Sequence, residues 1–338
     1  MMNNLKKITK KFLLNTGILR WAGQSRNSGV AILRYHSVSN NPQDLNDIIG
    51  YGIVHSSDVF NQQMKILSNY FSPVSMDDVY DFIKHKTKMP SRAVALTFDD
   101  GYSDNASIAA PIMDQYGIRG AFYITTGAVD PQPLPWFITL RRIFNCCTDK
   151  EFLSPLDGSL YQLKIPQQRR EAFLQASRYC ALLDLSSQRQ WINRLEQLLD
   201  MDPFLGNGLM MTKTQIRDLH DAGHIIGSHT ISHPNLAHVD ESRLQTELAD
   251  SKFALEKILG LGSSVLHFSY PSPILQPHYN EKTKLFCKDI GYQTGVTCTH
   301  GLVYSDDEAL ICRRISAPQS IEDFKWVLES TFAGFSTK

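Results

Sequence analysis

Short apolar runs alternate with longer amphipathic segments along most of the chain. Runs rich in Val, Ala, Ile and Leu that are bounded by turn residues are typical of buried strands. They occur at residues 30–33, 94–98, 121–124, 225–228, 265–268 and 295–297. Segments with the pattern of helices lie at residues 104–116, 212–219, 240–260, 282–289 and 321–329. Strands that alternate with helices predict a parallel sheet with helical crossovers, but this pattern does not distinguish an open sheet from a closed barrel.

Two polar motifs stand directly after predicted strands. Asp99 and Asp100 follow one strand in the run Thr-Phe-Asp-Asp-Gly, and His229 and His233 follow another. Alone, an Asp-Asp-Gly run is typical of a turn, and isolated histidines are often exposed or capping residues. Both motifs, however, stand at strand ends, where α/β proteins gather their active sites. Two imidazoles and one carboxylate can hold a divalent metal and leave the other carboxylate free, which predicts a metal-assisted hydrolase.

These motifs resemble those of the polysaccharide deacetylase family, the NodB-homology or carbohydrate esterase family 4 enzymes. The first run is Thr-Phe-Asp-Asp-Gly, and the second is Gly-Ser-His-Thr-Ile-Ser-His-Pro-Asn-Leu. Residues 268–271, Phe-Ser-Tyr-Pro, are similar to a third family segment. The likeness extends from about residue 32 to about residue 315, with one interruption. It implies an α/β fold, a distorted (β/α) barrel of the NodB-homology type with a mostly helical insertion.

The resemblance assigns roles to the charged residues of the first two motifs. By position it implies that Asp100, His229 and His233 bind the metal, which we expect to be Zn²⁺. It also implies that Asp99 is the catalytic base. Amides are poor electrophiles, so their hydrolysis needs an activated water, and a carboxylate beside the metal can take the proton of that water.

The third segment carries one further expectation and one departure from the family pattern. The resemblance places the backbone N–H of Tyr270, before Pro271, as a donor to the oxyanion of the reaction; a plain strand terminus is the alternative. Many family members have an arginine before this proline that steadies the base, and this chain has Ser269 and Tyr270 instead. Arg314 is a candidate replacement that would pair with Asp99, although an arginine entering a strand is more often a surface residue.

Two other histidines are candidates for the site. Family members use a histidine in a late Leu-x-His segment as general acid, and this segment is not clearly present here. His300 is the nearest candidate, and a loop histidine beside Gly301 is the alternative. His36 follows the predicted strand at 30–33. We expect it to face the same end of the barrel as a pocket residue, not as a metal ligand.

Composition and charge exclude some classes of partner. The chain of 338 residues carries 34 Lys+Arg and 34 Asp+Glu, so no global charge favours nucleic acid. The six cysteines include no Cys-x-x-Cys pair. This scatter suggests reduced packing residues more than a disulfide framework.

The chain divides into three predicted parts. Residues 1–28 form a basic amphipathic segment, and residues 29–338 form the catalytic domain, interrupted by a mostly helical insertion at 131–211. Helices are expected within the insertion near 167–183 and 187–199. The insertion follows a strand end. Two alternatives therefore stand for it, a lid over the pocket and a side subdomain without substrate contact.

The N-terminal segment helps to predict where in the cell the protein is located. Residues 5–21 interleave lysines with apolar side chains and lack the long apolar run and cleavage site of a secretory signal. The chain has no stretch of about 18–20 apolar residues, so no membrane span is predicted. We expect a cytoplasmic protein. A helix at 5–21 that lies on the inner membrane face is the alternative to a plain solvated helix.

The expected location suggests a substrate. A cytoplasmic deacetylase would meet sugars during glycan assembly rather than finished polymers. We therefore expect it to remove the N-acetyl group from an amino sugar, free, nucleotide-linked or lipid-linked, in polysaccharide biosynthesis. Deformylation of a formamido sugar by the same residues is a close alternative. A non-catalytic, metal-containing carbohydrate-binding module is the alternative from another class, because the arginine is missing and the general acid is unclear.

Overall fold

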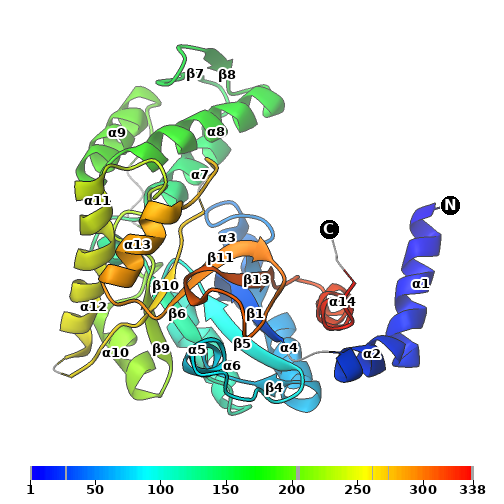
Figure 1. The fold of residues 1–338 in the computed structure, drawn as a ribbon. Coiled ribbons are helices and arrows are strands. Elements are labelled where there is room, and N and C mark those ends of the chain that lie inside the picture. The colour runs from blue at the N-terminus through cyan, green and yellow to red at the C-terminus, as the bar shows by residue number, and fades with distance from the viewer. Residues whose placement is uncertain (1, 27–28, 203–205, 261, 273, 336–338) are drawn as a thin grey trace.

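A closed barrel of seven parallel strands forms the centre of the described structure (Figure 1). The computed structural model describes residues 2–26, 29–202, 206–260, 262–272 and 274–335. Residues 1, 27–28 and 203–205, which belong to the predicted N-terminal segment and insertion, lie outside the described residues. The barrel strands are β1 (Val30–Tyr35), β5 (Ala93–Phe98), β6 (Ala121–Ile124), β9 (Ile225–Ser228), β10 (His267–Ser269), β11 (Thr294–His300) and β13 (Cys312–Ser316).

Pairing between the first two barrel strands closes the sheet. The order is β1-β13-β11-β10-β9-β6-β5, and β5 pairs back with β1 in parallel register, with Ala31 opposite Val94. Two short strands extend the sheet, β12 (Leu302–Val303) antiparallel beside β1 and β4 (Ser72–Pro73) parallel beside β5. Most barrel residues are buried, which explains their continuous apolar runs. The expectation of a distorted (β/α) barrel is confirmed.

Helices surround the barrel and complete its core. Most helix starts are capped by side chains, as the sequence predicts for α10, where Thr212 accepts from the Gln215 N–H. The helices of this layer are α3 (Pro42–Asn46), α4 (Ser57–Tyr70), α5 (Met76–Lys84), α6 (Ala110–Asp114), α10 (Lys213–Asp221), α11 (Glu241–Gln245), α12 (Ser251–Leu259), α13 (Glu281–Asp289) and α14 (Ile321–Phe332). Smaller elements are β2 (Ser37–Ser39), β3 (Val54–Ser56) and the short 3₁₀ turns η2 (Thr126–Ala128) and η4 (Ala309–Ile311).

Two predicted helices contain a π-helical turn. The helix expected at 104–116 is observed as η1 (Asn105–Ala109) followed by α6. Pro111 lacks an N–H and crowds the preceding turn, which disfavours a regular α-helix there. The helix expected at 240–260 is observed as α11, a π turn η3 (Thr246–Asp250), and α12.

The strand predicted at 265–268 is displaced toward its C-terminus. β10 begins at His267 and includes Ser269. The N–H of Val265 instead donates to Glu256 Oε1 of α12 at 3.1 Å. Residue 265 is therefore held by a helix side chain rather than by a neighbouring strand, which an apolar run alone does not reveal.

The insertion has a hydrophobic core of its own. Its elements are α7 (Trp136–Cys146), β7 (Glu151–Leu153), β8 (Leu160–Gln162), α8 (Pro166–Leu182) and α9 (Leu185–Leu198). Leu140, Phe144, Ala176 and Leu195 are buried together in this core. Figure 1 shows α7, α8 and α9 at one end of the barrel, beyond the carboxyl ends of its strands. The two predicted helices are thus present, while the proposed domain boundaries stay predictions.

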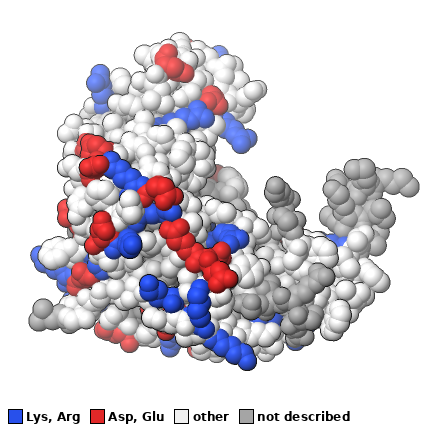
Figure 2. Space-filling model, viewed as in Figure 1, with Lys and Arg blue, Asp and Glu red and all other residues white. Residues whose placement is uncertain are grey.

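The N-terminal segment forms two helices beside α14. These are α1 (Met2–Thr16) and α2 (Ile18–Arg26). Lys10 pairs with Asp323 of α14, and α2 packs closely enough that a Cβ at Gly23 would lie 3.1 Å from Phe332 Cβ. None of the helices in the described part of the chain is both long and apolar enough to cross a membrane. On the face shown in Figure 2, acidic and basic side chains are interspersed.

Candidate metal centre and active site

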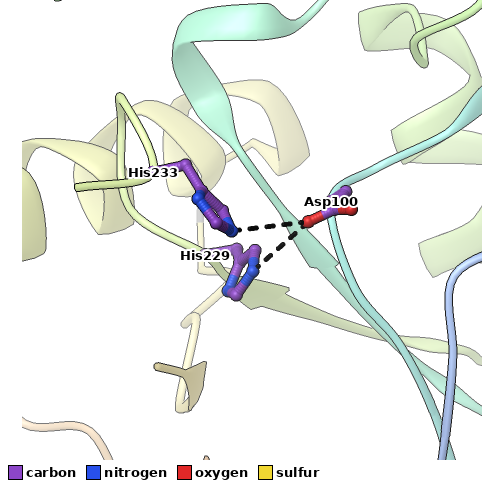
Figure 3. Close-up of side chains that lie close together, drawn as sticks. All are labelled: Asp100, His229 and His233. Carbon is purple, nitrogen blue, oxygen red and sulfur yellow. Dashed lines mark ion pairs between the residues drawn. The ribbon is translucent and has the colours of Figure 1, made fainter. Parts of the chain in front are cut away.

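Three side chains of the predicted metal site converge at the carboxyl ends of β5 and β9 (Figure 3). Asp100 Oδ1 lies 3.4 Å from His229 Nε2 and 3.7 Å from His233 Nε2. One ligand atom from each residue lies within 4.8 Å of the others. Zinc bonds of about 2.1 Å at tetrahedral angles separate neighbouring ligand atoms by about 3.4 Å. The observed spacing therefore fits one small divalent ion held by all three side chains.

The protonation states of this cluster suit a divalent metal. His229 Nδ1 lies 2.7 Å from the Ser269 carbonyl oxygen, which can only accept, so Nδ1 carries the proton and Nε2 is free to bind metal. Burial, reinforced by the neighbouring His229, lowers the pKa of His233 to about 4. Burial would raise the pKa of Asp100, but the nearby imidazoles, His229 first, lower it to about 2. At neutral pH the cluster therefore offers the Asp100 carboxylate and the neutral imidazole of His233, and the Ser269 contact of His229 leaves its Nε2 facing them.

Unusual backbone conformations aim these ligands at one point. Asp100 (φ 77°), Thr230 (φ 67°) and His233 (φ 53°) all lie in the left-handed region. Each such non-glycine residue costs on the order of 1–3 kcal/mol, which surrounding contacts must offset. Strain at two of the three ligand positions is what a functional constraint on this end of the barrel would produce.

Glu247 stabilises the loop that carries the histidines. Its buried carboxylate Oε2 accepts from the Ile231 N–H at 2.8 Å and the Ser232 N–H at 2.9 Å, and Oε1 accepts from the Ser232 hydroxyl. This residue was not among those predicted from the sequence. The available signal was an acidic side chain beside Leu248, on the apolar face of the helix predicted at 240–260.

The insertion also contacts this loop. The indole Nε1 of Trp136 in α7 donates to the Ser232 carbonyl at 3.2 Å, and the ring of Phe137 lies 4.7 Å from that of His233, centroid to centroid. Trp136 is buried. The first helix of the insertion therefore packs on the ligand loop, while its role as a lid over substrate stays a prediction.

A buried ion pair lies beside the metal cluster. Arg314 Nη1 and Nη2 donate to Asp99 Oδ1 and Oδ2, each at 2.8 Å, and both side chains are almost fully buried. Ser269 Oγ donates to Asp99 Oδ1 at 3.0 Å, and Arg314 Nε donates to the Thr297 carbonyl. Burial would raise the pKa of Asp99, but the Arg314 guanidinium holds it well below its usual range. Asp99 is therefore ionised at neutral pH, and Arg314 occupies the place beside it that the sequence analysis considered.

The remaining candidates occupy different positions. His36 directly follows β1, and burial lowers its pKa to about 4, although the charges of Asp100 and Asp99 act in the opposite direction. His300 is exposed at the end of β11 and is not part of the three-residue cluster. Its role as general acid stays a prediction.

The predicted role of the Tyr270 amide needs correction. Its backbone N–H donates to the Val296 carbonyl at 3.1 Å and continues the pairing of β10 with β11. An N–H used in this way is not free to donate to an oxyanion. The side chain is buried beside Phe268, and Pro271 is also buried. The segment thus acts here as a strand terminus, while its Ser269 supplies hydrogen bonds to both halves of the site.

The fold and the site together define a class of protein, a closed (β/α) barrel with an Asp-His-His cluster and an ionised aspartate at the carboxyl ends of its strands. The family described as polysaccharide deacetylase matches residues 86–150 and 187–295, just over half of the chain. The chain belongs to this family. The unmatched residues 151–186 lie within the insertion.

Individual relatives agree with this assignment. YxkH from Bacillus subtilis, whose name places it among polysaccharide deacetylases, is 20% identical over 296 residues, 87% of this chain and 74% of YxkH. The Streptococcus pyogenes deacetylase PplD, solved in complex with acetate, has a TM-score of 0.59 at 19% identity, covering 90% of this chain and 98% of PplD. IcaB from Ammonifex degensii has a TM-score of 0.57 at 16% identity, covering 90% and 97%. At these identities the structures show a shared fold.

Proposed function

We propose that the protein removes the N-acetyl group from an amino sugar by metal-dependent hydrolysis of the amide bond. One observation carries the proposal: an ionised carboxylate, Asp99, lies beside a cluster of three metal-type ligands. A turn or a pair of capping histidines has no need of a fully buried arginine that keeps a neighbouring carboxylate charged. Membership of the polysaccharide deacetylase family supports the same chemistry.

The side chains divide the work of hydrolysis. Asp100, His229 and His233 would hold Zn²⁺, since three nitrogen and oxygen ligands are typical of catalytic zinc. When bound, the ion supplies Lewis acidity toward the amide carbonyl and lowers the pKa of a water from about 16 to about 7. Asp99 is the proton acceptor. Its Oδ2 accepts a hydrogen bond from Arg314 at 2.8 Å and retains a second lone pair for the proton.

Departure of the amine requires a proton donor. We retain His300 for this role, because it lies at the carboxyl end of β11, next to Arg314 in the register of β13. Its exposure would allow it to regain a proton from solvent between turnovers. His36, near both carboxylates and neutral at pH 7, would line the pocket that receives the acetamido group.

Two observations favour N-deacetylation over the alternative functions, the binding module and the deformylase. The non-catalytic module was motivated by a missing arginine, and Arg314 supplies a guanidinium to Asp99 from another strand. PplD was solved with acetate, which favours an acetyl group over a formyl group for this fold. The sugar is proposed to be a free, nucleotide-linked or lipid-linked intermediate of glycan assembly, and no nucleic acid is proposed as partner.

Proton NMR of the purified protein with acetamido and formamido sugars tests the function. With zinc present we expect release of acetate, and chelation of the metal should abolish it until zinc is restored. Formate release instead would identify a deformylase. Sugar binding without any acyl release, in protein shown to hold metal, would contradict hydrolysis and favour the binding module.

A peripheral membrane location on the inner face is a further proposal for residues 5–21. The side chains of Phe12, Ile18 and Trp21 are 62%, 50% and 71% exposed. Lys10 of the same segment instead forms an ion pair with Asp323 of α14. Phe12 lies on α1, and Ile18 and Trp21 lie on α2. Exposed apolar side chains on helices that also carry basic residues favour an anionic surface. We expect the protein to sediment with vesicles containing anionic lipid, and Trp21→Ser to reduce sedimentation severalfold. Equal sedimentation with neutral vesicles, or no effect of the substitution, would contradict this contact.

A further inference from the structure

A hollow of about 280 Å³ lies between the segment after α3 and helices α7 and α8 of the insertion. Three arginines line it, Arg141 from α7 and Arg169 and Arg170 from the first turns of α8. Aromatic walls come from Tyr51, which is 73% exposed, and Phe173. The residues that line this arginine hollow include no acidic side chain in the described part of the chain.

The arginines of the hollow differ from their neighbours on the same helices. Arg142 Nη1 lies 3.7 Å from Glu196 Oε1, and Arg178 Nη1 lies 3.3 Å from Glu171 Oε1. None of the ion pairs found among the described residues involves the three arginines of the hollow. Elsewhere on the surface, as on the face in Figure 2, charges of both signs are interspersed. Three guanidinium groups that share one hollow with no acidic side chain among its lining residues repel one another, and a bound anion would relieve this repulsion.

Packing positions Arg141 within the hollow. A Cβ at residue 50 would lie 2.6 Å from Arg141 Nη1, so Gly50 leaves the space in which this guanidinium sits. On another side the guanidinium lies 5.6 Å from the centroid of the Phe173 ring. A planar group held in this way is suited to paired hydrogen bonds with phosphoryl oxygens, because less freedom is lost on binding.

Arg141 also links the hollow to the metal centre. Burial lowers the pKa of Arg141, whereas the neighbouring Tyr102 and Asp100 act in the opposite direction. Phe137 lies one turn before Arg141 on α7, and its ring lies 4.7 Å from that of His233, so the helix that carries Arg141 also packs on the loop of the predicted metal ligands. A molecule that occupies the hollow would lie next to the active site.

We propose that the arginine hollow binds a phosphate or diphosphate group that is attached to the sugar whose acyl group enters the metal centre. This inference rests on the proposed function and specifies its substrate class, a phosphorylated amino sugar. Neutral glycan would place no anion between the three arginines that line the hollow. The diphosphate could belong to a nucleotide or to a lipid carrier, since both present the same oxygens.

Binding of inorganic diphosphate to chelator-treated protein tests the hollow without requiring turnover. Calorimetric titration should show binding that weakens at least threefold in Arg170→Gln and at least tenfold in Arg141→Gln. Arg178→Gln, on α8 but paired outside the hollow, is the matched control and should bind like wild type. Arg170 is exposed, so its variant carries the test if Arg141→Gln fails to fold. Equal affinity in wild type and Arg170→Gln, or tighter binding of glucuronate than of diphosphate, would overturn the proposal.

Measurements of turnover distinguish a failure of the arginine hollow from a failure of the proposed function on which it rests. For Arg170→Gln, the KM of a phosphorylated N-acetylamino sugar should rise at least fivefold relative to that of the same sugar without phosphate. If acyl release occurs and the ratio of the two KM values is the same as in wild type, the proposed role of the arginine hollow is overturned and the proposed function stands. Diphosphate binding that depends on the arginines, without acyl release from any sugar, would overturn the proposed function alone. Tighter binding of uridine diphosphate than of geranyl diphosphate would identify a nucleotide carrier, and the reverse a lipid carrier.

Discussion

Replacing Asp99 by asparagine is expected to abolish turnover while the protein still binds its metal. The substitution keeps the shape of the side chain and removes its ability to accept a proton, and general base catalysis contributes roughly 10²–10⁴-fold in rate. Asp100→Ala should lose both metal and activity, because it removes one of three ligands. Acetate release by NMR and metal content by elemental analysis measure the two effects separately.

A surface carboxylate near the amino ends of β6 and β9, paired with Arg119 and His224, provides the control for these variants. Asp114→Asn, on α6 and exposed, should leave activity and metal content unchanged. Wild-type activity in Asp99→Asn would remove the basis for its role as base. Retention of tightly bound metal by Asp100→Ala would likewise contradict its assignment as a ligand.

Replacing Arg314 by methionine should destabilise the fold and reverse the pH dependence that Asp99 confers. Removal of one partner from a buried pair typically costs about 3–5 kcal/mol, because the other charge is left uncompensated. In the native protein the pKa of Asp99 lies below its unfolded value of about 3.9, so its contribution to stability is present above that pH and is lost on acidification. Without Arg314, burial dominates and the pKa of Asp99 rises. The variant should then lose stability as pH increases above about 4.

Urea unfolding between pH 4 and pH 8 measures this reversal. Arg313→Met is the matched control, since Arg313 pairs with Asp307 at a partly exposed position and should change the free energy of unfolding by less than about 1 kcal/mol. The double variant Arg314→Met with Asp99→Asn should recover part of the loss, because the uncompensated charge is gone. If Arg314→Met matches Arg313→Met in stability at every pH, the buried pair is not the determinant that we infer.

Local patterns in the sequence predicted the part of the site that lies immediately after two strands. Asp99, Asp100, His229 and His233 each stand within five residues of an apolar run, and strand ends in a parallel sheet share one edge. Their spacing along the chain therefore carried spatial information. The likeness of these runs to a family supplied the barrel, which periodicity alone does not distinguish from an open sheet.

The residues that support the site from other elements could not be predicted from local patterns in the sequence. Glu247 and Arg314 act through contacts with segments 15 and 215 residues away along the chain. An acidic residue on a helix or an arginine in a strand has the same local pattern whether it is solvated or buried against a partner. The Tyr270 amide was misassigned for a related reason, since only the pairing of β10 with β11 shows which carbonyl accepts its proton.

The sequence by itself determined the alternation of strands and helices, the positions of the two ligand motifs at strand ends, and the family. Those features depend on residue type and on short spacings, which local physical rules govern. Tertiary structure alone decided the closure of β5 on β1, the buried charge pair at Asp99, and the meeting of three arginines in one hollow beside the insertion. Each of these depends on which distant segments pack together, and the free energy of that packing is a property of the whole barrel and its insertion.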